Sequence, residues 1–265
     1  MKESYNYILS NLVFITRIPV RLKFEYKSDK GNVRFFPLIG IILGVIMGSI
    51  ALVSQRLFGS LPAATLSVLS MIILTGGIHL DGLSDMADGL LSYKDRDTVI
   101  EIMKDSRIGA MGVIALVSLI ILKIVFVNLL ISSNLLQFVF FYPVVGRLAI
   151  VNACYFGRPI AKSRLGAGFI GNIKTLEFLL IQASYLIFMV IINLALTGAD
   201  SFLLASIPLV IALAVNLFFS KKLVKNVTNA IGGISGDILG GACELAEALS
   251  LPLFFLGVKI CEGLI

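Results

Sequence analysis

The chain has 265 residues, of which 58% are hydrophobic and only 14% are charged. A soluble globular domain carries roughly twice this share of charged residues, so the composition excludes an ordinary soluble fold. The net charge of +6 at pH 7 is explained by basic loops beside an anionic membrane surface, and we expect no nucleic-acid partner.

Apolar stretches near the length that crosses about 30 Å of hydrocarbon recur along the chain. In chain order they predict spans at 35–58, 61–80, 108–131, 135–154, 176–197, 201–219 and 238–260. We therefore predict an all-α, polytopic transmembrane helical bundle of about seven spans, with six to eight possible. No stretch is long enough for a separate soluble domain, so residues 1–265 are expected to form a single integral membrane domain.

The distribution of Lys and Arg predicts the orientation of this bundle. If the N-terminus is cytoplasmic, 18 of the 22 Lys and Arg residues fall in cytoplasmic segments, two fall near the outer face and two lie within spans. Cytoplasmic loops of membrane proteins are enriched in these residues. We therefore expect a multi-pass protein of the cell membrane with a cytoplasmic N-terminus and its long polar loops in the cytoplasm.

Three aspartates lie close together in the sequence HLDGLSDMADGL, residues 79–90. On a helix, Asp85 and Asp88 lie about 40° and 20° to either side of Asp81, so the three carboxylates share one stripe. Like charges this close repel unless a cation neutralises them. Carboxylate oxygens suit Mg²⁺ or Mn²⁺, particularly when substrate phosphates complete the coordination. The alternative is ordinary surface charge at a solvated helix end.

A second acidic group lies in GGISGDILGGACELAEALSL, residues 232–251. Asp237 and Glu244 are seven residues apart and align on one helical face. Ionisable residues within a membrane segment are costly and commonly mark a functional site, although a partly interfacial helix would leave these acids in water. We expect catalytic segments at 75–112 and 226–247, both on the cytoplasmic side, where they could line one cavity.

Several cationic and polar residues could bind an anionic substrate. Lys104 and Arg107 precede the span at 108–131, where a helix N-terminus favours phosphate, although basic residues also flank spans for orientation. Arg147 lies inside a span and needs a carboxylate or phosphate partner. Asn226 and Asn229 could bind a sugar or amide, or could be caps or turn residues.

His79 is the only histidine. It lies about 160° from Asp81 around the helix, away from the acidic stripe. A hydrogen-bonded structural role is the simpler interpretation, and a general base or a contact to a substrate base is the alternative.

The chain resembles the cobalamin (5′-phosphate) synthase family, also called adenosylcobinamide-GDP ribazoletransferase. The resemblance is carried by motifs along most of the chain: FITRIPV at 14–20, RFFPLIGIILG at 34–44, TGGIHLDGLSDMADGL at 75–90, IMKDSRIGAMGV at 102–113, GR at 146–147 and GGISGDILGGACELAE at 232–247. Residues 155–225 contribute little to it.

The resemblance implies a Mg²⁺-dependent transferase that joins adenosylcobinamide-GDP to α-ribazole, or to its 5′-phosphate, and releases GMP. It implies metal binding by Asp81, Asp85 and Asp88, with Asp237 and Glu244 as further ligands or base. It also implies that Lys104, Arg107 and Arg147 hold the diphosphate or the departing nucleotide. The small-molecule substrates and the lipid bilayer are then the expected partners.

Three other classes of protein use intramembrane acids. A CDP-alcohol phosphotransferase would show an Arg shortly after its first Asp-Gly, whereas Asp81-Gly82 is followed by Leu-Ser-Asp. A membrane prenyltransferase would need a second Asp-rich motif, for which Asp237 and Glu244 are a poor match. A transporter would show paired broken helices, and the glycine-rich segment 232–241 has no clear counterpart in the first half.

Overall fold

The computed structural model describes residues 2–27, 30–160, 168, 170–198 and 202–264. Within these ranges the chain is all-α, as predicted, with one isolated parallel bridge between Pro159 and Ile234. The helices in chain order are α1 (Lys2–Ile15), η1 (Lys30–Phe35), α2 (Phe36–Phe58), α3 (Ser60–Thr75), α4 (Ile78–Leu90), α5 (Arg96–Ile102), α6 (Ala110–Ser132), η2 (Leu136–Phe140), α7 (Tyr142–Phe156), α8 (Thr175–Thr197), α9 (Phe202–Ile231) and α10 (Gly236–Leu264).

In the part of the chain that the structure describes, six helical segments are long and apolar enough to cross a membrane: α2 with the end of η1, α6, η2 together with α7, α8, α9 and α10. The pair α3 and α4 qualifies as a seventh span only if the two are counted together, because they meet at a bend of 90°. The predicted range of six to eight spans therefore agrees with the structure. We place α4 outside the membrane-spanning segments, because it turns away from α3 and carries the three aspartates.

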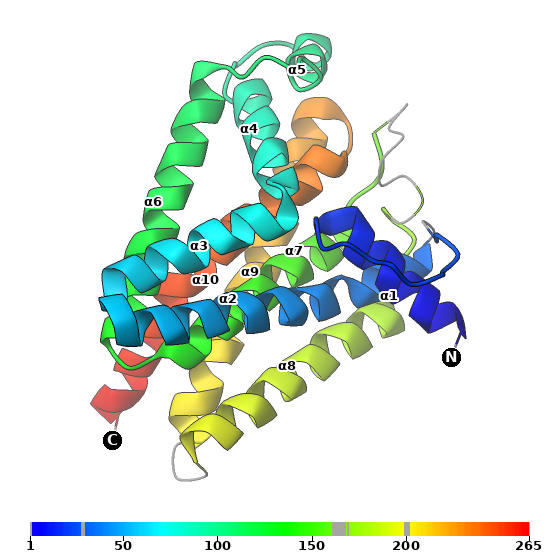
Figure 1. Ribbon diagram of the computed structural model, residues 1–265. Helices are drawn as coiled ribbons and strands as arrows, with labels where there is room; N and C mark the ends of the chain where they lie inside the picture. The colour runs from blue at the N-terminus through cyan, green and yellow to red at the C-terminus, as the bar shows by residue number, and fades with distance from the viewer. Residues whose placement is uncertain (1, 28–29, 161–167, 169, 199–201, 265) are drawn as a thin grey trace.

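Helix α7 occupies the centre of the bundle. Its span is 89% buried, whereas that of α8 at the periphery is 17% buried. Close approach to α2 helps to explain this burial, since a Cβ on Gly40 of α2 would lie 2.7 Å from the carbonyl oxygen of Pro143 in α7. Helix α10 packs beside α7 and also contacts α4, α6 and α9 (Figure 1). It therefore connects the acidic segment of α4 with the core.

The bend between α3 and α4 corrects the predicted continuous span at 61–80. The membrane-crossing helix ends at Thr75, and the next two residues, Gly76 and Gly77, have φ angles of +63° and +73°. This left-handed conformation favours glycine, which lacks a Cβ. A new helix therefore starts at Ile78 in a different direction and carries the aspartates away from the axis of α3.

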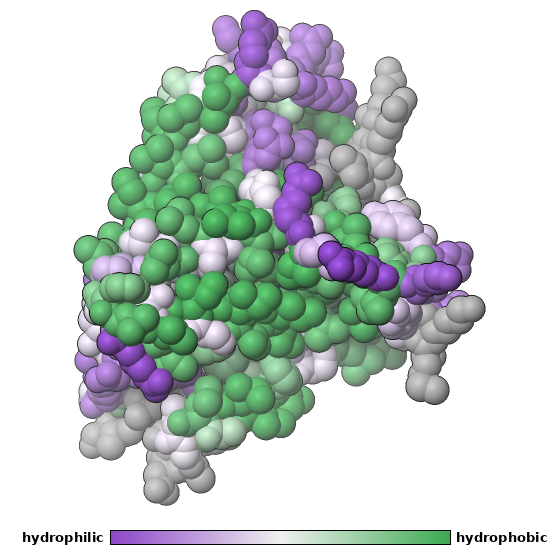
Figure 2. All heavy atoms as spheres, viewed as in Figure 1, coloured by the Kyte–Doolittle hydropathy of each residue, from purple (hydrophilic) through white to green (hydrophobic). Residues whose placement is uncertain are grey.

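Polar segments from distant parts of the sequence gather at one end of the bundle. Helix α1, the α4–α5 region and the turn between α9 and α10 lie at this end, and the C-terminus lies at the other (Figure 1). Figure 2 shows an extensive hydrophobic surface over the helices between the two ends, with hydrophilic side chains gathered around α4 and α5. Lys162 and Arg164, which contribute to the predicted orientation, lie outside the described residues.

Candidate active site

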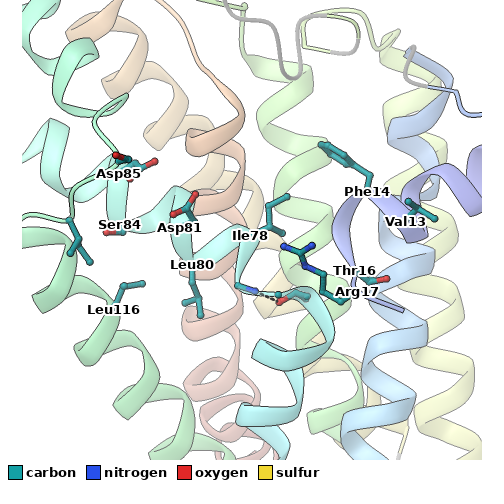
Figure 3. A pocket seen from close by; sticks show the side chains of 15 residues that line it. Val13, Phe14, Thr16, Arg17, Ile78, Leu80, Asp81, Ser84, Asp85 and Leu116 are labelled. Atoms are coloured by element: carbon teal, nitrogen blue, oxygen red, sulfur yellow. Dashed lines mark hydrogen bonds between the residues drawn. The ribbon is translucent and has the colours of Figure 1, made fainter. Parts of the chain in front are cut away.

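A cavity lined by two aspartates lies at the bend between α3 and α4 and has a volume of about 570 Å³. Helix α4 contributes the carboxylates of Asp81 and Asp85, and the segment after α1 contributes Arg17 (Figure 3). The backbone N–H of Arg17 donates to the carbonyl of Leu74 at 2.6 Å, which fixes this segment against the end of α3. The cavity therefore combines two carboxylates and one guanidinium, an arrangement suited to a cation and a phosphorylated ligand.

The surroundings of Asp85 on α4 disfavour the ionised form of its carboxyl group. Its partial burial, together with the charges of Asp81, Asp237 and Asp88, raises the pKa of its carboxyl group to about 6. A neighbouring cation would relieve this repulsion and lower the pKa again. The electrostatics of the cavity therefore favour a bound cation.

Asp88, predicted as a metal ligand, has two backbone partners. Its carboxylate oxygens accept hydrogen bonds from the N–H groups of Gly109 at 2.7 Å and Gly112 at 2.8 Å, at the start of α6. The first N–H groups of a helix have no partner within the helix and favour negative charge. Asp88 therefore caps α6 and joins it to α4, which leaves Asp81 and Asp85 as the aspartates of the stripe that line the cavity.

A second, smaller cavity adjoins the first and has a volume of about 160 Å³. Asp81 lines both cavities, and the smaller one is also lined by His79 of α4 and Asp237 of α10. The two acidic segments therefore meet, as the sequence suggested they could. Burial, followed by the charges of Arg147 and Lys123, lowers the pKa of His79, which keeps its imidazole neutral.

Close packing of α4 on α10 brings Asp81 and Asp237 together. A Cβ on Gly82 would lie 2.7 Å from the carbonyl oxygen of Asp237 and 3.0 Å from its Cα. Because glycine has no Cβ, the two helices can approach closely at this point. The side chain of Asp237 accepts a hydrogen bond from the Ser235 hydroxyl at 3.1 Å.

Glu244 and Arg147 occupy a different place from the one predicted. Lys123 of α6 donates to Glu244 and to Glu247, each at 2.6 Å, and Arg147 of α7 pairs with Glu247. All four side chains are buried, and their two positive and two negative charges balance. We call this set the buried ion network. Arg147 thus has the carboxylate partner that its position requires, and the network ties α6, α7 and α10 together in the core.

Lys104 and Arg107 are exposed and do not line either cavity. Arg107 binds Asp105 instead, with its Nη2 atom 2.7 Å from the carboxylate, and this hydrogen bonding lowers the pKa of Asp105 to about 2. We predicted a phosphate site at the start of α6. The backbone N–H groups at this position instead donate hydrogen bonds to the carboxylate of Asp88. Asn226 and Asn229 are exposed near the end of α9 and line neither cavity.

The residues around the larger cavity fit a magnesium ion that shares its coordination with substrate. In the described parts of the chain, no three His, Cys, Asp or Glu side chains lie close enough to hold a metal by themselves. Mg²⁺ is commonly held by only one or two carboxylates, with water and substrate phosphates completing its shell. Asp81 and Asp85 are one helical turn apart and both line the cavity, so they can supply such a pair.

Arg17 is the site residue that the sequence did not single out. It lies on the exposed segment after α1, where a lone arginine before a span is indistinguishable from a residue that sets orientation. Its place within FITRIPV, the first of the motifs that carry the family resemblance, was the available signal. Only the packing of this segment over Gly76 brings the guanidinium to the cavity.

The fold and the site define a polytopic helical membrane protein with an acidic cleft suited to phosphoryl chemistry. The family model for cobalamin-5-phosphate synthase matches residues 7–255, and the chain belongs to this family of transferases. The match favours this activity over the other phosphotransferases, the prenyltransferases and the transporters considered above.

Curated relatives named adenosylcobinamide-GDP ribazoletransferase match almost the whole chain. The protein from Clostridioides difficile is 34% identical over 92% of this chain and 95% of its own length. The protein from Caldanaerobacter subterraneus is 35% identical over 95% of this chain and 98% of its own length. The protein from Alkaliphilus metalliredigens is 37% identical over 97% of this chain and 97% of its own length. No solved structure matches the chain significantly.

Proposed function

We propose that the chain transfers the adenosylcobinamide phosphate group from adenosylcobinamide-GDP to α-ribazole or its 5′-phosphate, with release of GMP. Membership of the synthase family over residues 7–255 carries this proposal, because the acidic cleft alone would suit many phosphoryl transfers. The product would be adenosylcobalamin or its phosphate, formed in the last assembly step of the nucleotide loop of cobalamin.

Phosphoryl transfer depends mainly on positioning and on neutralising charge. We assign the diphosphate of the donor to the larger cavity, where the guanidinium of Arg17 can bind phosphate oxygens. Asp81 and Asp85 would hold Mg²⁺. When bound, this ion would neutralise negative charge on the phosphates and on the departing GMP.

The proposed reaction forms one P–O bond and breaks another. A ribose hydroxyl of ribazole attacks the phosphorus attached to cobinamide, the bridging P–O bond of the diphosphate breaks, and GMP leaves with the bonding electrons. We assign the carboxylate of Asp237 as the acceptor of the hydroxyl proton, because it lines the smaller cavity beside Asp81. Glu244 is not given this role, since Lys123 already neutralises it inside the bundle.

We further propose that the site faces the cytoplasm from the cell membrane. The support is the excess of Lys and Arg in the segments assigned to that side, together with the position of α4 and α5 among the hydrophilic residues at one end of the bundle (Figure 2). In this orientation, substrates present in the cytoplasm reach the cleft without crossing the membrane.

The activity can be tested with purified protein in lipid nanodiscs, supplied with adenosylcobinamide-GDP, α-ribazole and Mg²⁺. GMP release and the corrinoid product would be followed by chromatography, with EDTA and the Asp85→Asn variant as controls. We expect product only with metal and with Asp85 intact. Absence of product from correctly assembled wild-type protein would contradict the proposed function, and full activity of Asp85→Asn would contradict the role of Asp85.

A further inference from the structure

A groove with a volume of about 870 Å³ lies between α2 and α8, away from the acidic cleft. Helix α8 packs against α9 and α7. It also reaches the residues before α2, where the hydroxyl of Tyr185 donates to the carbonyl of Arg34 at 3.3 Å. Both α2 and α8 are long and apolar enough to cross a membrane, and the span of α8 is only 17% buried. The groove between them therefore lies at the lipid-facing surface of the bundle.

The lining of this groove changes from charged to apolar along both helices. Lys174 lines it at the start of α8 and Arg34 just before α2, and both helices start at the end of the bundle where α1 lies (Figure 1). Further along the two helices the walls include Leu38, Ile41 and Phe188. A phospholipid shows the same division, because its charged headgroup lies in the interfacial region and its acyl chains lie in the hydrocarbon.

The charged end of the groove carries a net positive charge. Arg34 and Lys174 are both exposed, and neither forms an ion pair with a described residue. Glu177 is the one carboxylate among the described residues of the lining. The guanidinium of Arg34 lies 5.0 Å from the centre of the Phe35 ring and 5.7 Å from that of Tyr7. These rings hold the guanidinium in place through cation–π contacts, while its in-plane N–H groups can still bind phosphate oxygens.

Basic residues that flank spans for orientation are the simpler explanation of Arg34 and Lys174. That explanation does not account for the apolar groove that continues from them between two membrane helices. Basic residues at the cytoplasmic end of such a space bind the headgroups of anionic lipids, and the cytoplasmic leaflet carries a negative surface potential. The orientation proposed above places this end of the groove in that leaflet.

We propose that the groove between α2 and α8 is a binding site for an anionic phospholipid. The phosphate binds at the end formed by Arg34 and Lys174, and an acyl chain lies along Leu38, Ile41 and Phe188. The site is separate from the acidic cleft and does not depend on the proposed function. A bound lipid fills the space between α8 and α2, and thereby joins the peripheral helix to the rest of the bundle.

The test uses tryptophan as a reporter, because the chain contains none. Phe188→Trp places an indole ring in the groove, and Ile187→Trp places one at the neighbouring exposed position outside it. Each full-length variant is reconstituted in phosphatidylcholine vesicles that contain a small fraction of acyl-brominated phosphatidylglycerol or, for comparison, acyl-brominated phosphatidylcholine. Bromine quenches indole fluorescence at short range, so the quenching reports which lipid lies beside each tryptophan.

We expect phosphatidylglycerol to bind beside Phe188→Trp on the order of fivefold more tightly than phosphatidylcholine, the preference that one net positive charge near the interface typically confers. Ile187→Trp should show no such preference. Adding Arg34→Gln and Lys174→Gln to Phe188→Trp should remove the preference. Adding Lys222→Gln and Lys225→Gln should not, since these remove two exposed cations near the end of α9 that do not line the groove.

Equal quenching of Phe188→Trp by the two lipids, or a preference that survives Arg34→Gln and Lys174→Gln, would overturn the site. The same loss of preference with Lys222→Gln and Lys225→Gln would assign it to general surface charge, which also overturns the site.

Weaker quenching of Phe188→Trp than of Ile187→Trp by both lipids would show that protein, such as a second copy of the chain, covers the groove in place of lipid. If the variant with Arg34→Gln does not assemble, as judged by gel filtration, Lys174→Gln alone decides the question. This change lies at an exposed position and should lower the preference for phosphatidylglycerol by itself.

Discussion

Asp88 and Gly109 are 21 residues apart, yet the carboxylate of Asp88 accepts a hydrogen bond from the backbone N–H of Gly109 at 2.7 Å. A second bond, from Gly112 at 2.8 Å, engages the other oxygen. The contact joins the end of α4 to the start of α6, on either side of the loop that holds α5. It also separates the roles of three aspartates that look equivalent in the sequence.

Asp88→Asn should therefore reduce stability more than metal affinity. Loss of the negative charge at the start of α6 should lower the free energy of unfolding by about 1–2 kcal/mol, the usual range for a helix cap. Thermal unfolding in detergent checks the first effect, and a Mg²⁺ titration of activity checks the second. Asp97→Asn, at an exposed position in α5, is the matched control. An unchanged melting temperature with a higher Mg²⁺ requirement would instead make Asp88 a metal ligand.

Asp81→Asn and Asp85→Asn should behave differently from Asp88→Asn. Because both residues line the cavity proposed for the diphosphate, each change should lower the rate of GMP release on the order of 100-fold, with little loss of stability. Raising the Mg²⁺ concentration should recover part of the activity. Activity within twofold of wild type in either variant would remove that residue from the proposed site.

Arg17→Ala should weaken use of the phosphorylated donor. Loss of a charge-assisted hydrogen bond should raise the KM for adenosylcobinamide-GDP on the order of 10-fold or more, with the KM for ribazole unchanged. Arg107→Ala is the control, because Arg107 is exposed, pairs with Asp105 and does not line the cavity. Equal increases in the KM for adenosylcobinamide-GDP in the two variants would show that the overall positive charge around Arg17 and Arg107, and not the position of Arg17 in the cavity, determines donor binding.

Lys123→Met should destabilise the bundle strongly. It leaves two buried carboxylates facing one arginine, and removing one partner of a buried pair typically costs about 3–5 kcal/mol. The double change Lys123→Met with Glu244→Gln leaves Arg147 paired with Glu247 and should recover much of the loss. Lys259→Met is the control, since Lys259 and Glu262 form an exposed pair at 2.6 Å. Melting temperatures in detergent would be compared among these variants. If the double variant lost the sum of the stabilities lost by Lys123→Met and Glu244→Gln alone, coupling within the buried ion network would be refuted.

Gly82→Ala should impair activity by displacing α4 from α10. The added methyl group would meet the backbone of Asp237 at 2.7–3.0 Å, so the two helices would have to move apart. We expect a loss of GMP release on the order of 10- to 100-fold, because a small misplacement of reacting groups has a large effect on rate. Gly263→Ala near the end of α10 has no atom within 4 Å and is the control. Unchanged activity in Gly82→Ala would show that the site tolerates this displacement.

The sequence alone determined the class of fold and most of the spans. Apolar stretches of spanning length predict transmembrane helices because the bilayer satisfies no backbone hydrogen bonds. The family resemblance was also available from local motifs, and the match over residues 7–255 confirms it. Helical spacing placed Asp81 and Asp85 on one face, and the structure has both lining one cavity.

Tertiary structure decided which charged residues serve the site and which serve the core. Asp237 and Glu244 share a helical face, but α10 carries one to the cavity beside Asp81 and the other to Lys123 in the bundle. Arg17 joins the site only because its segment packs over the bend at Gly76 and Gly77. A helical pattern specifies the face of a residue within its own helix, whereas the charge partners of Lys123 and Arg147 lie 121 and 100 residues away in the chain. Only the packing of α4, α6, α7 and α10 against one another could supply them.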